Sequence, residues 1–217
     1  MPTLGAVSLW KAFEGRTGLL PVTFSLATGE HLAVTGPSGC GKSTLLRLLA
    51  GLIEPSGGTV LDGGRIVNRP GARTSPHRRD IGMVFQGLAL WPHRTVRGHV
   101  ELSVRSHRGL LGRKDRRRRV AEVLDEAGLS GLADRYPGDL SGGEKQRAAW
   151  ARAVAGGPRL LLLDEPLTAL DPALREDLLA RVVRHGDMPG CTIIIVTHDR
   201  AVADRVGRRV LELVKAG

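Results

Sequence analysis

Residues 36–43 have the types and spacing of a phosphate-binding loop. Glycines at positions 36, 39 and 41 precede the pair Lys42 and Ser43, which fits the pattern G-x-x-x-x-G-K-[ST]. Glycine lets the backbone turn tightly and direct its N–H groups at phosphate oxygens. Lys42 can reach the β- and γ-phosphates, and the Ser43 hydroxyl can enter the coordination shell of Mg²⁺. This spacing therefore predicts a site for a nucleoside triphosphate and its magnesium ion.

The segments around this loop fit the same chemistry. Residues 31–35 are predicted as a strand and residues 43–50 as a helix, whose N-terminus adds partial positive charge to the site. The alternative is a glycine-rich turn without a ligand, which the full spacing and the flanking segments disfavour. We expect Cys40 to be a small packing residue of the loop rather than a reactive thiol. The residues expected to contact the nucleotide here are Gly36, Pro37, Ser38, Gly39, Cys40, Gly41, Lys42, Ser43 and Thr44.

A pair of carboxylates, Asp164 and Glu165, directly follows the apolar run at 160–163. A continuous apolar run of this length is typical of a strand buried on both faces. Acidic side chains at the end of such a strand are costly to bury unless their charges are paired. A polar strand end without a function is the alternative. Beside a phosphate-binding loop we expect Asp164 to hold Mg²⁺ and Glu165 to polarise the attacking water as a general base.

Short apolar runs alternate with longer helical patterns along the chain. The predicted strands are 22–26, 31–35, 81–85, 160–163 and 193–196, and the predicted helices are 43–50, 115–127 and 172–184. Strand, helix and strand in succession predict a parallel sheet and an α/β fold. From about residue 95 to 138 the patterns are helical, with no convincing strand. We therefore expect a helical insert in an α/β core.

The full set of motifs resembles the nucleotide-binding domain of ATP-binding cassette (ABC) proteins. Residues 140–147, Leu-Ser-Gly-Gly-Glu-Lys-Gln-Arg, resemble the ABC signature closely, and they stand between the phosphate-binding loop and Asp164. The remaining motifs, also in the family's order, are Gln86, Ala-Leu-Asp at 169–171 and Thr-His-Asp at 197–199. An ordered match over nearly the whole chain is far more specific than any single motif. It implies a P-loop NTPase core with a mainly parallel sheet, an N-terminal antiparallel β portion and an inserted α-helical subdomain.

The resemblance also implies a shared site in a dimer. Ser141, Gly142 and Gly143 would stand at a helix start and bind the γ-phosphate of an ATP held by the partner cassette. Two such sites would be shared across a head-to-tail dimer with twofold symmetry. Asp171, a plausible helix N-cap followed by a proline, would couple the two sites across the interface.

Further roles follow from the same resemblance. Gln86 would touch Mg²⁺ or its water and report the nucleotide state. His198 would contact the γ-phosphate and brace Glu165. The expected catalytic set is Glu165, His198 and Lys42, and the expected metal ligands are Ser43, Gln86 and Asp164.

Two aromatic positions near the N-terminus could serve the adenine base. Phe13 matches the family's stacking position, and Trp10 is the nearby alternative; an aromatic residue near a strand can equally belong to the core. The loop at 88–93 resembles that of bacterial importer ATPases. Its residues Leu88, Leu90 and Trp91 could contact a membrane subunit or pack in the helical part, and the sequence favours neither. Arg-Gly-His at 97–99 departs from the Glu-Asn common in relatives, which weakens any assignment to a subfamily.

Composition excludes several other classes. The chain of 217 residues carries a net charge of +10, and its basic run at 113–119 fits either a nucleic-acid or lipid contact or a solvated helix face. No aromatic residues are interleaved in the run for base stacking, so we favour the solvated face. No apolar run is long enough to span a bilayer. Cys40 and Cys191 form neither a disulfide framework nor a metal cluster, which indicates a soluble protein in a reducing compartment.

The expected function is that of an ATP-binding and hydrolysing subunit that energises transport of an unidentified solute. It would work as a homodimer or with a second cassette, on separate integral membrane permease subunits, at the cytoplasmic inner face of the cell membrane; a solute-binding protein would be a further partner of an importer. We expect one domain over residues 1–217, with the helical insert at about 95–140 and no C-terminal regulatory domain.

The alternative is a soluble ABC ATPase acting on nucleic acid or ribosomes. The DNA-repair members of this superfamily carry a long coiled coil or zinc modules between the phosphate-binding loop and the signature. Here only residues 87–139 separate Gln86 from the signature, and two cysteines cannot build a zinc module, so nucleic acid is not an expected partner. A small-molecule P-loop kinase is a third class, against which the signature and His198 argue.

Overall fold

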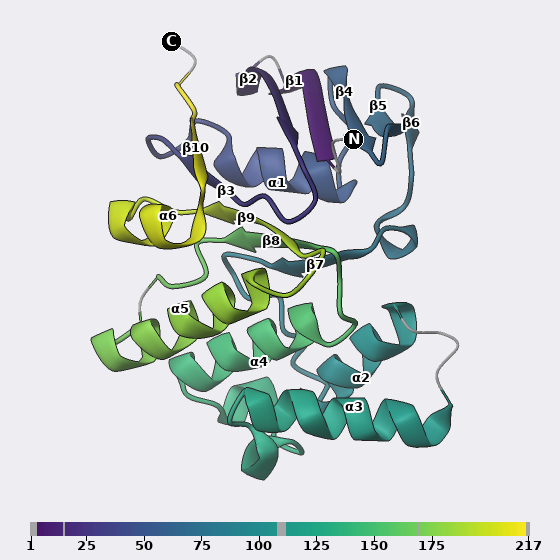
Figure 1. The fold of residues 1–217 in the computed structure, drawn as a ribbon, viewed down its shortest axis with the longest axis vertical. Helices are drawn as coiled ribbons and strands as arrows, with labels where there is room; N and C mark the ends of the chain where they lie inside the picture. The colour runs from purple at the N-terminus through teal and green to yellow at the C-terminus, as the bar shows by residue number, and fades with distance from the viewer. Residues whose placement is uncertain (1–3, 15, 108–111, 169, 216–217) are drawn as a thin grey trace.

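The computed structural model describes residues 4–14, 16–107, 112–168 and 170–215, and it contains two sheets (Figure 1). Sheet B is parallel and has the order β10-β3-β9-β8-β7. Its strands are β3 (Leu32–Thr35), β7 (Ile81–Val84), β8 (Leu160–Asp164), β9 (Thr192–Val196) and β10 (Arg209–Glu212). The carboxyl ends of its neighbouring strands therefore meet at one edge, where loops can bring distant residues together.

Sheet B is covered on both faces, which explains its continuous apolar runs. On β8, Leu160 and Leu162 face the cluster around α1 (Lys42–Ala50), whereas Leu161 and Leu163 face the helices on the other side. All five residues of β8 are buried. The covering helices on the second face are α4 (Gly142–Val154) and α5 (Pro172–Gly186), as Figure 1 shows. Burial on both faces is the reason that these strands are apolar rather than alternating.

Sheet A is antiparallel and has the order β2-β1-β4-β5-β6. Its strands are β1 (Leu4–Phe13), β2 (Arg16–Leu26), β4 (Gly57–Asp62), β5 (Arg65–Arg69) and β6 (Ala72–Arg73). Its apolar face joins the cluster that contains α1. The expected N-terminal antiparallel portion is therefore confirmed.

The helices between β7 and α4 extend the core on the face of sheet B opposite α1. They are α2 (Val96–His107), α3 (Arg113–Glu126) and two short 3₁₀ turns (Ser130–Leu132 and Pro137–Asp139). Another 3₁₀ turn (Pro76–Arg78) precedes β7, and α6 (Arg200–Val206) lies between β9 and β10. Val100, Val120 and Leu124 join the same buried cluster as α4. The expected α/β P-loop fold is confirmed; the bounds proposed for the helical insert stay a prediction.

Most predicted segments are present, with shifted ends. The helix predicted at 43–50 begins at Lys42, and the helix predicted at 172–184 continues to Gly186. The strand predicted at 22–26 was too short, because β2 begins at Arg16 and pairs with β1 along its length.

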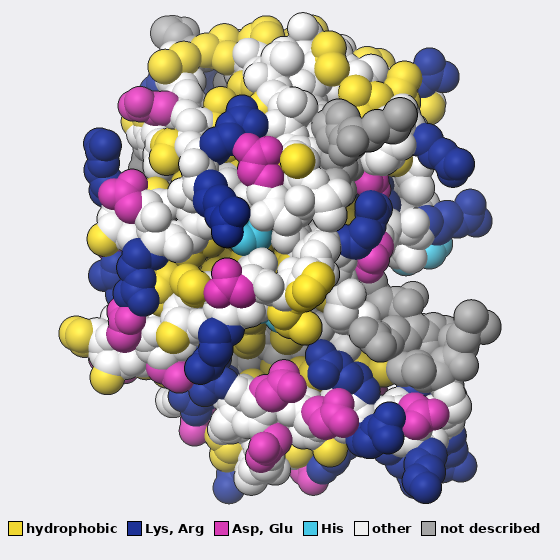
Figure 2. All heavy atoms as spheres, in the orientation of Figure 1, with side chains coloured by type: hydrophobic (Ala, Val, Ile, Leu, Met, Phe, Trp, Pro, Cys, Tyr) yellow, Lys and Arg dark blue, Asp and Glu magenta, His cyan; other side chains and the backbone are white. Residues whose placement is uncertain are grey.

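The basic run lies on α3, where two of its arginines pair with acidic neighbours. Arg118 is 3.4 Å from Asp115 and 3.6 Å from Glu122, and Arg119 is 3.6 Å from Glu122. Figure 2 shows blue and magenta side chains interspersed over the helical part of the molecule. Such pairs favour the interpretation of the run as a solvated helix face. Among the described helices, none combines the length and apolarity that crossing a membrane requires.

Candidate functional site

The phosphate-binding loop connects β3 to α1 and depends on left-handed glycines. Gly36, Gly39 and Gly41 have φ angles of 138°, 81° and 101°. Side chains are strained at such angles. A Cβ atom at Gly41 would also overlap the carbonyl oxygen of Gly18 in β2. Cys40 is buried within the loop, consistent with a packing role.

The Lys42 ammonium lies against the loop itself. Its Nζ donates to the carbonyl oxygens of Gly36, at 2.8 Å, and Pro37, at 2.9 Å. These bonds hold the charge over the turn at the N-terminus of α1. Phosphate oxygens attracted to the free N–H groups of that N-terminus would meet the ammonium there.

Two of the residues expected to hold magnesium, Ser43 at the start of α1 and Asp164 at the end of β8, come together. Ser43 Oγ donates a hydrogen bond of 3.0 Å to Asp164 Oδ1, although 121 positions separate them in the sequence. Asp164 is only 2% exposed. Burial raises the pKa of this carboxyl, and the Ser43 hydrogen bond opposes that rise. A buried carboxylate beside a hydroxyl is a pair of hard oxygen donors, which fits the ligand preference of Mg²⁺.

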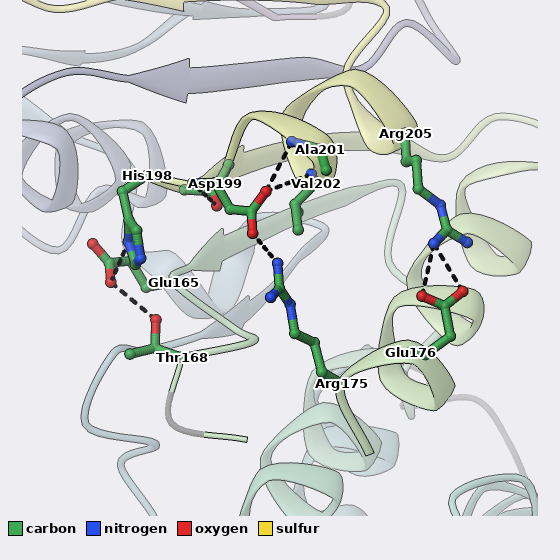
Figure 3. Close-up of polar contacts among 10 residues, drawn as sticks. Glu165, Thr168, Arg175, Glu176, His198, Asp199, Ala201, Val202 and Arg205 are labelled. Atoms are coloured by element: carbon green, nitrogen blue, oxygen red, sulfur yellow. Dashed lines mark hydrogen bonds and ion pairs between the residues drawn. The ribbon is translucent and has the colours of Figure 1, made fainter. Parts of the chain in front are cut away.

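Glu165, the next residue, is held in an unusual conformation. Its φ angle is 48°, in the left-handed region, and its backbone N–H donates to the Val196 carbonyl at 3.1 Å. Its Oε2 accepts a 3.0 Å hydrogen bond from Thr168 Oγ1 and lies 3.4 Å from His198 Nδ1 (Figure 3). Backbone strain of this kind collects at functional sites. A cavity of about 170 Å³ opens beside these side chains.

Two further predicted contacts to the nucleotide are Gln86 and an aromatic ring. Gln86 is exposed two residues after β7, the neighbour of β8 in sheet B. Phe13 is 45% exposed at the end of β1, with its ring packed over Gly18, the residue whose carbonyl abuts Gly41. Trp10 instead packs against Gly57 within sheet A. The geometry therefore favours Phe13 as the ring nearer the phosphate-binding loop.

The signature residues begin α4. Ser141 is its N-cap and forms a capping box with Glu144, whose carboxylate accepts from Ser141 N at 2.7 Å. A Cβ atom at Gly143 would overlap the Leu174 side chain of α5, so glycine allows these two helix starts to pack closely. Within the described chain no hydrogen bond or ion pair connects these residues to positions 36–44. They lie at the start of a different helix from the phosphate-binding loop.

Asp171 caps α5 as predicted from the sequence. Its Oδ1 accepts from Leu174 N at 3.0 Å, and Pro172 occupies the first turn. The preceding residue of the motif, Leu170, packs partly against the core, and Ala169 lies outside the described residues.

The apolar residues of the loop after Gln86 lie in two different environments. Leu88 and Leu90 are partly buried against the core, whereas Trp91 is 44% exposed. Leu88 and Ala89 both have left-handed φ angles, of 59° and 50°. Arg152 of α4, which no sequence motif marks, donates to the carbonyls of Leu88 and Ala89 and thereby fixes the loop.

Comparison with known proteins agrees with this arrangement. The family described as ABC transporter matches residues 19–168. The chain belongs to the ABC transporter family. Among solved structures it is similar to the ATP-binding cassette MJ0796 in a dimeric post-hydrolysis state bound to ADP and Pi, with 32% identity and a TM-score of 0.86 over 97% of this chain and 94% of that one.

Curated members of the ABC family extend the comparison. The sulfate/thiosulfate import ATP-binding protein CysA 2 of Chromobacterium violaceum is 42% identical over 94% of this chain and 55% of its own length. The spermidine/putrescine import ATP-binding protein PotA of Acidothermus cellulolyticus is 42% identical over 96% of this chain and 54% of its own length. The chain thus spans about half the length of the curated relatives it matches.

Proposed function

We propose that this ABC cassette binds MgATP at residues 36–44 and hydrolyses it as one half of a cassette dimer. The observation that carries the proposal is the meeting of Ser43, Asp164, Glu165 and His198 at one edge of sheet B. Family membership and the similarity to a dimeric cassette bound to ADP and Pi support it. Phe13 is proposed to stack on the adenine, and Ser141, Gly142 and Gly143 to complete the partner's site.

Each side chain has a role that its position supports. Lys42 neutralises phosphate charge at the N-terminus of α1. Ser43 and Asp164 would hold Mg²⁺, which when bound neutralises charge on the phosphates, with Gln86 nearby as a further oxygen donor. Glu165 is the proposed general base. Because Thr168 engages its Oε2, Oε1 is the oxygen left to take the proton of the attacking water.

Beyond hydrolysis, we propose that the cassette energises solute transport. The similar proteins of Chromobacterium and Acidothermus are named import ATP-binding proteins, which supports a role as an importer subunit. The cassette would act at the inner face of the cell membrane on separate integral membrane subunits, with the solute and any solute-binding protein still to be identified.

Two measurements test these proposals separately. Steady-state phosphate release should be present in the wild-type protein and nearly abolished in Glu165→Gln, which still binds ATP, whereas Lys42→Ala should lose ATP binding itself. Wild-type turnover by Glu165→Gln would refute the general-base assignment. For transport, tagged Glu165→Gln is recovered with ATP from detergent-solubilised membranes. Co-purification of a polytopic membrane protein is expected; recovery with nucleic acid or ribosomes alone would contradict a transport role.

A further inference from the structure

Two arginine–carboxylate pairs join α5 to α6 (Figure 3). Arg175 of α5 donates to Asp199 Oδ2, and Arg205 of α6 lies 2.8 Å from Glu176 of α5. The arginine side chains are similarly exposed, at 39% for Arg175 and 46% for Arg205. Both pairs therefore connect the same two helices at similar solvent exposure of their arginines. Only the Arg175 pair includes a sequence neighbour of His198, namely Asp199.

Asp199 uses both carboxylate oxygens. Its Oδ1 caps α6 by accepting from Ala201 N at 2.8 Å and Val202 N at 3.2 Å, which leaves Oδ2 to accept from Arg175. Its own backbone N–H donates to Thr197 Oγ1 at 3.0 Å. The residues on either side of His198 are consequently fixed, which restricts where the imidazole can lie.

On the Arg175 side, this contact lies near the start of α5, where the dimer interface is expected. Arg175 is one helical turn beyond Asp171, the N-cap of α5, and its backbone N–H donates to the Asp171 carbonyl at 2.9 Å. The guanidinium thus bridges the start of α5 and the segment that carries His198. His198 in turn lies 3.4 Å from the carboxylate of Glu165.

We propose that Arg175 is a positioning residue that, through Asp199, holds His198 against Glu165 and links this contact to the start of α5. The inference rests on the proposed ATP hydrolysis. Without the guanidinium, the carboxylate of Asp199 keeps only its cap on α6, and the segment around His198 gains rotational freedom. Since misplacement of a catalytic group slows the chemical step rather than binding, the loss falls on kcat and leaves KM for ATP unchanged.

The test compares Arg175→Gln with the matched control Arg205→Gln, which breaks the other bond between the same helices. We expect kcat to fall about tenfold in Arg175→Gln and to stay within about twofold of wild type in Arg205→Gln, with KM unchanged in both. Arg175→Lys should recover part of the loss. If Arg175→Gln does not fold, Asp199→Asn takes its place, because its Oδ1 can still cap α6 while the charge pair is lost.

A double-mutant cycle with His198→Ala separates positioning from simple stabilisation. In single-turnover measurements, Arg175→Gln should cause no further loss once His198 is absent, because it acts through that residue. Equal losses in Arg175→Gln and Arg205→Gln, or additive losses in the His198→Ala background, would overturn the inference while leaving the proposed hydrolysis intact. A wild-type protein without ATPase activity would instead overturn the proposed function and the inference with it.

Discussion

Arg79 is a buried arginine that holds the C-terminal end of α1. Replacing it by Met should strongly destabilise the protein. Arg79 is 5% exposed, and its guanidinium donates to the carbonyls of Leu49 in α1, at 2.7 Å, of Thr74, at 3.0 Å, and of Val67. Burial lowers the pKa of this guanidinium, whose charge faces the negative end of the helix dipole. The same group packs against Gly51, where a Cβ atom would meet it at 2.5 Å.

The size of the effect follows from these bonds. Hydrogen bonds to a charged donor contribute about 1.5–3 kcal/mol each, and Met leaves the buried carbonyls without a partner. Removing the buried charge offsets part of this loss. We therefore expect a loss of about 3 kcal/mol in unfolding free energy, out of the roughly 5–15 kcal/mol typical of domains. For a domain of this size that corresponds to a Tm lower by about 6–12 °C.

The assay is calorimetric unfolding of Arg79→Met beside Arg73→Met. Arg73 also donates to a carbonyl near the end of α1, Leu52 O at 2.7 Å, but its side chain is 42% exposed. Because exposed charges contribute little, the control should lose less than about 1 kcal/mol. Equal Tm shifts for the two variants would refute the reasoning that burial of Arg79 sets its contribution.

Three further predictions concern the site and its helices. Phe13→Ala should raise the Kd for ATP about fivefold through loss of stacking, whereas Trp10→Ala should not; the reverse result in a fluorescent-nucleotide titration would exchange their roles. Ser141→Ala removes the capping box of α4 and should lower Tm by about 2–4 °C, and an unchanged melting curve would contradict this. The pKa of Asp199 is held below its usual 3.8, chiefly by the hydrogen bond from Val202 N and then by the one from Arg175. The ionised carboxylate therefore stabilises the folded protein above pH 3.8, and this stabilisation is lost as the pH falls through the lower pKa of the folded state. Asp199→Asn should therefore lose less stability than wild type in acid denaturation, and parallel curves would refute it.

The sequence predicted the centre of the fold better than its N-terminal part. The strands β8 and β9 contain continuous apolar runs, at 160–163 and 193–196, because both of their faces are buried, and that pattern is visible locally. The pairing of β1 with β4 joins Leu4 to Asp62, far along the chain, and β1 is interrupted near Ser8, whose φ angle is 45°. Such non-local, irregular strands carry no clear alternation, so only the resemblance indicated them.

The residues of the candidate site also fall into those that the sequence predicts and those that only the structure reveals. The phosphate-binding loop is contiguous, so its spacing alone predicts its chemistry. Thr168 and Arg175 act through side-chain contacts that depend on how β8, α5 and α6 pack. A threonine or an arginine in such a position is ordinary in sequence, and only the three-dimensional arrangement shows what it touches.

Closure of this ATP-binding cassette as a dimer can be measured from the mass of Glu165→Gln in solution. Light scattering coupled to size-exclusion chromatography would compare the variant with MgATP and with MgADP, and Lys42→Ala with MgATP would serve as the control. We expect the mass of Glu165→Gln to double with MgATP and not with MgADP, because bound ATP that is not hydrolysed keeps the shared sites closed. A monomeric Glu165→Gln that has bound ATP would contradict it.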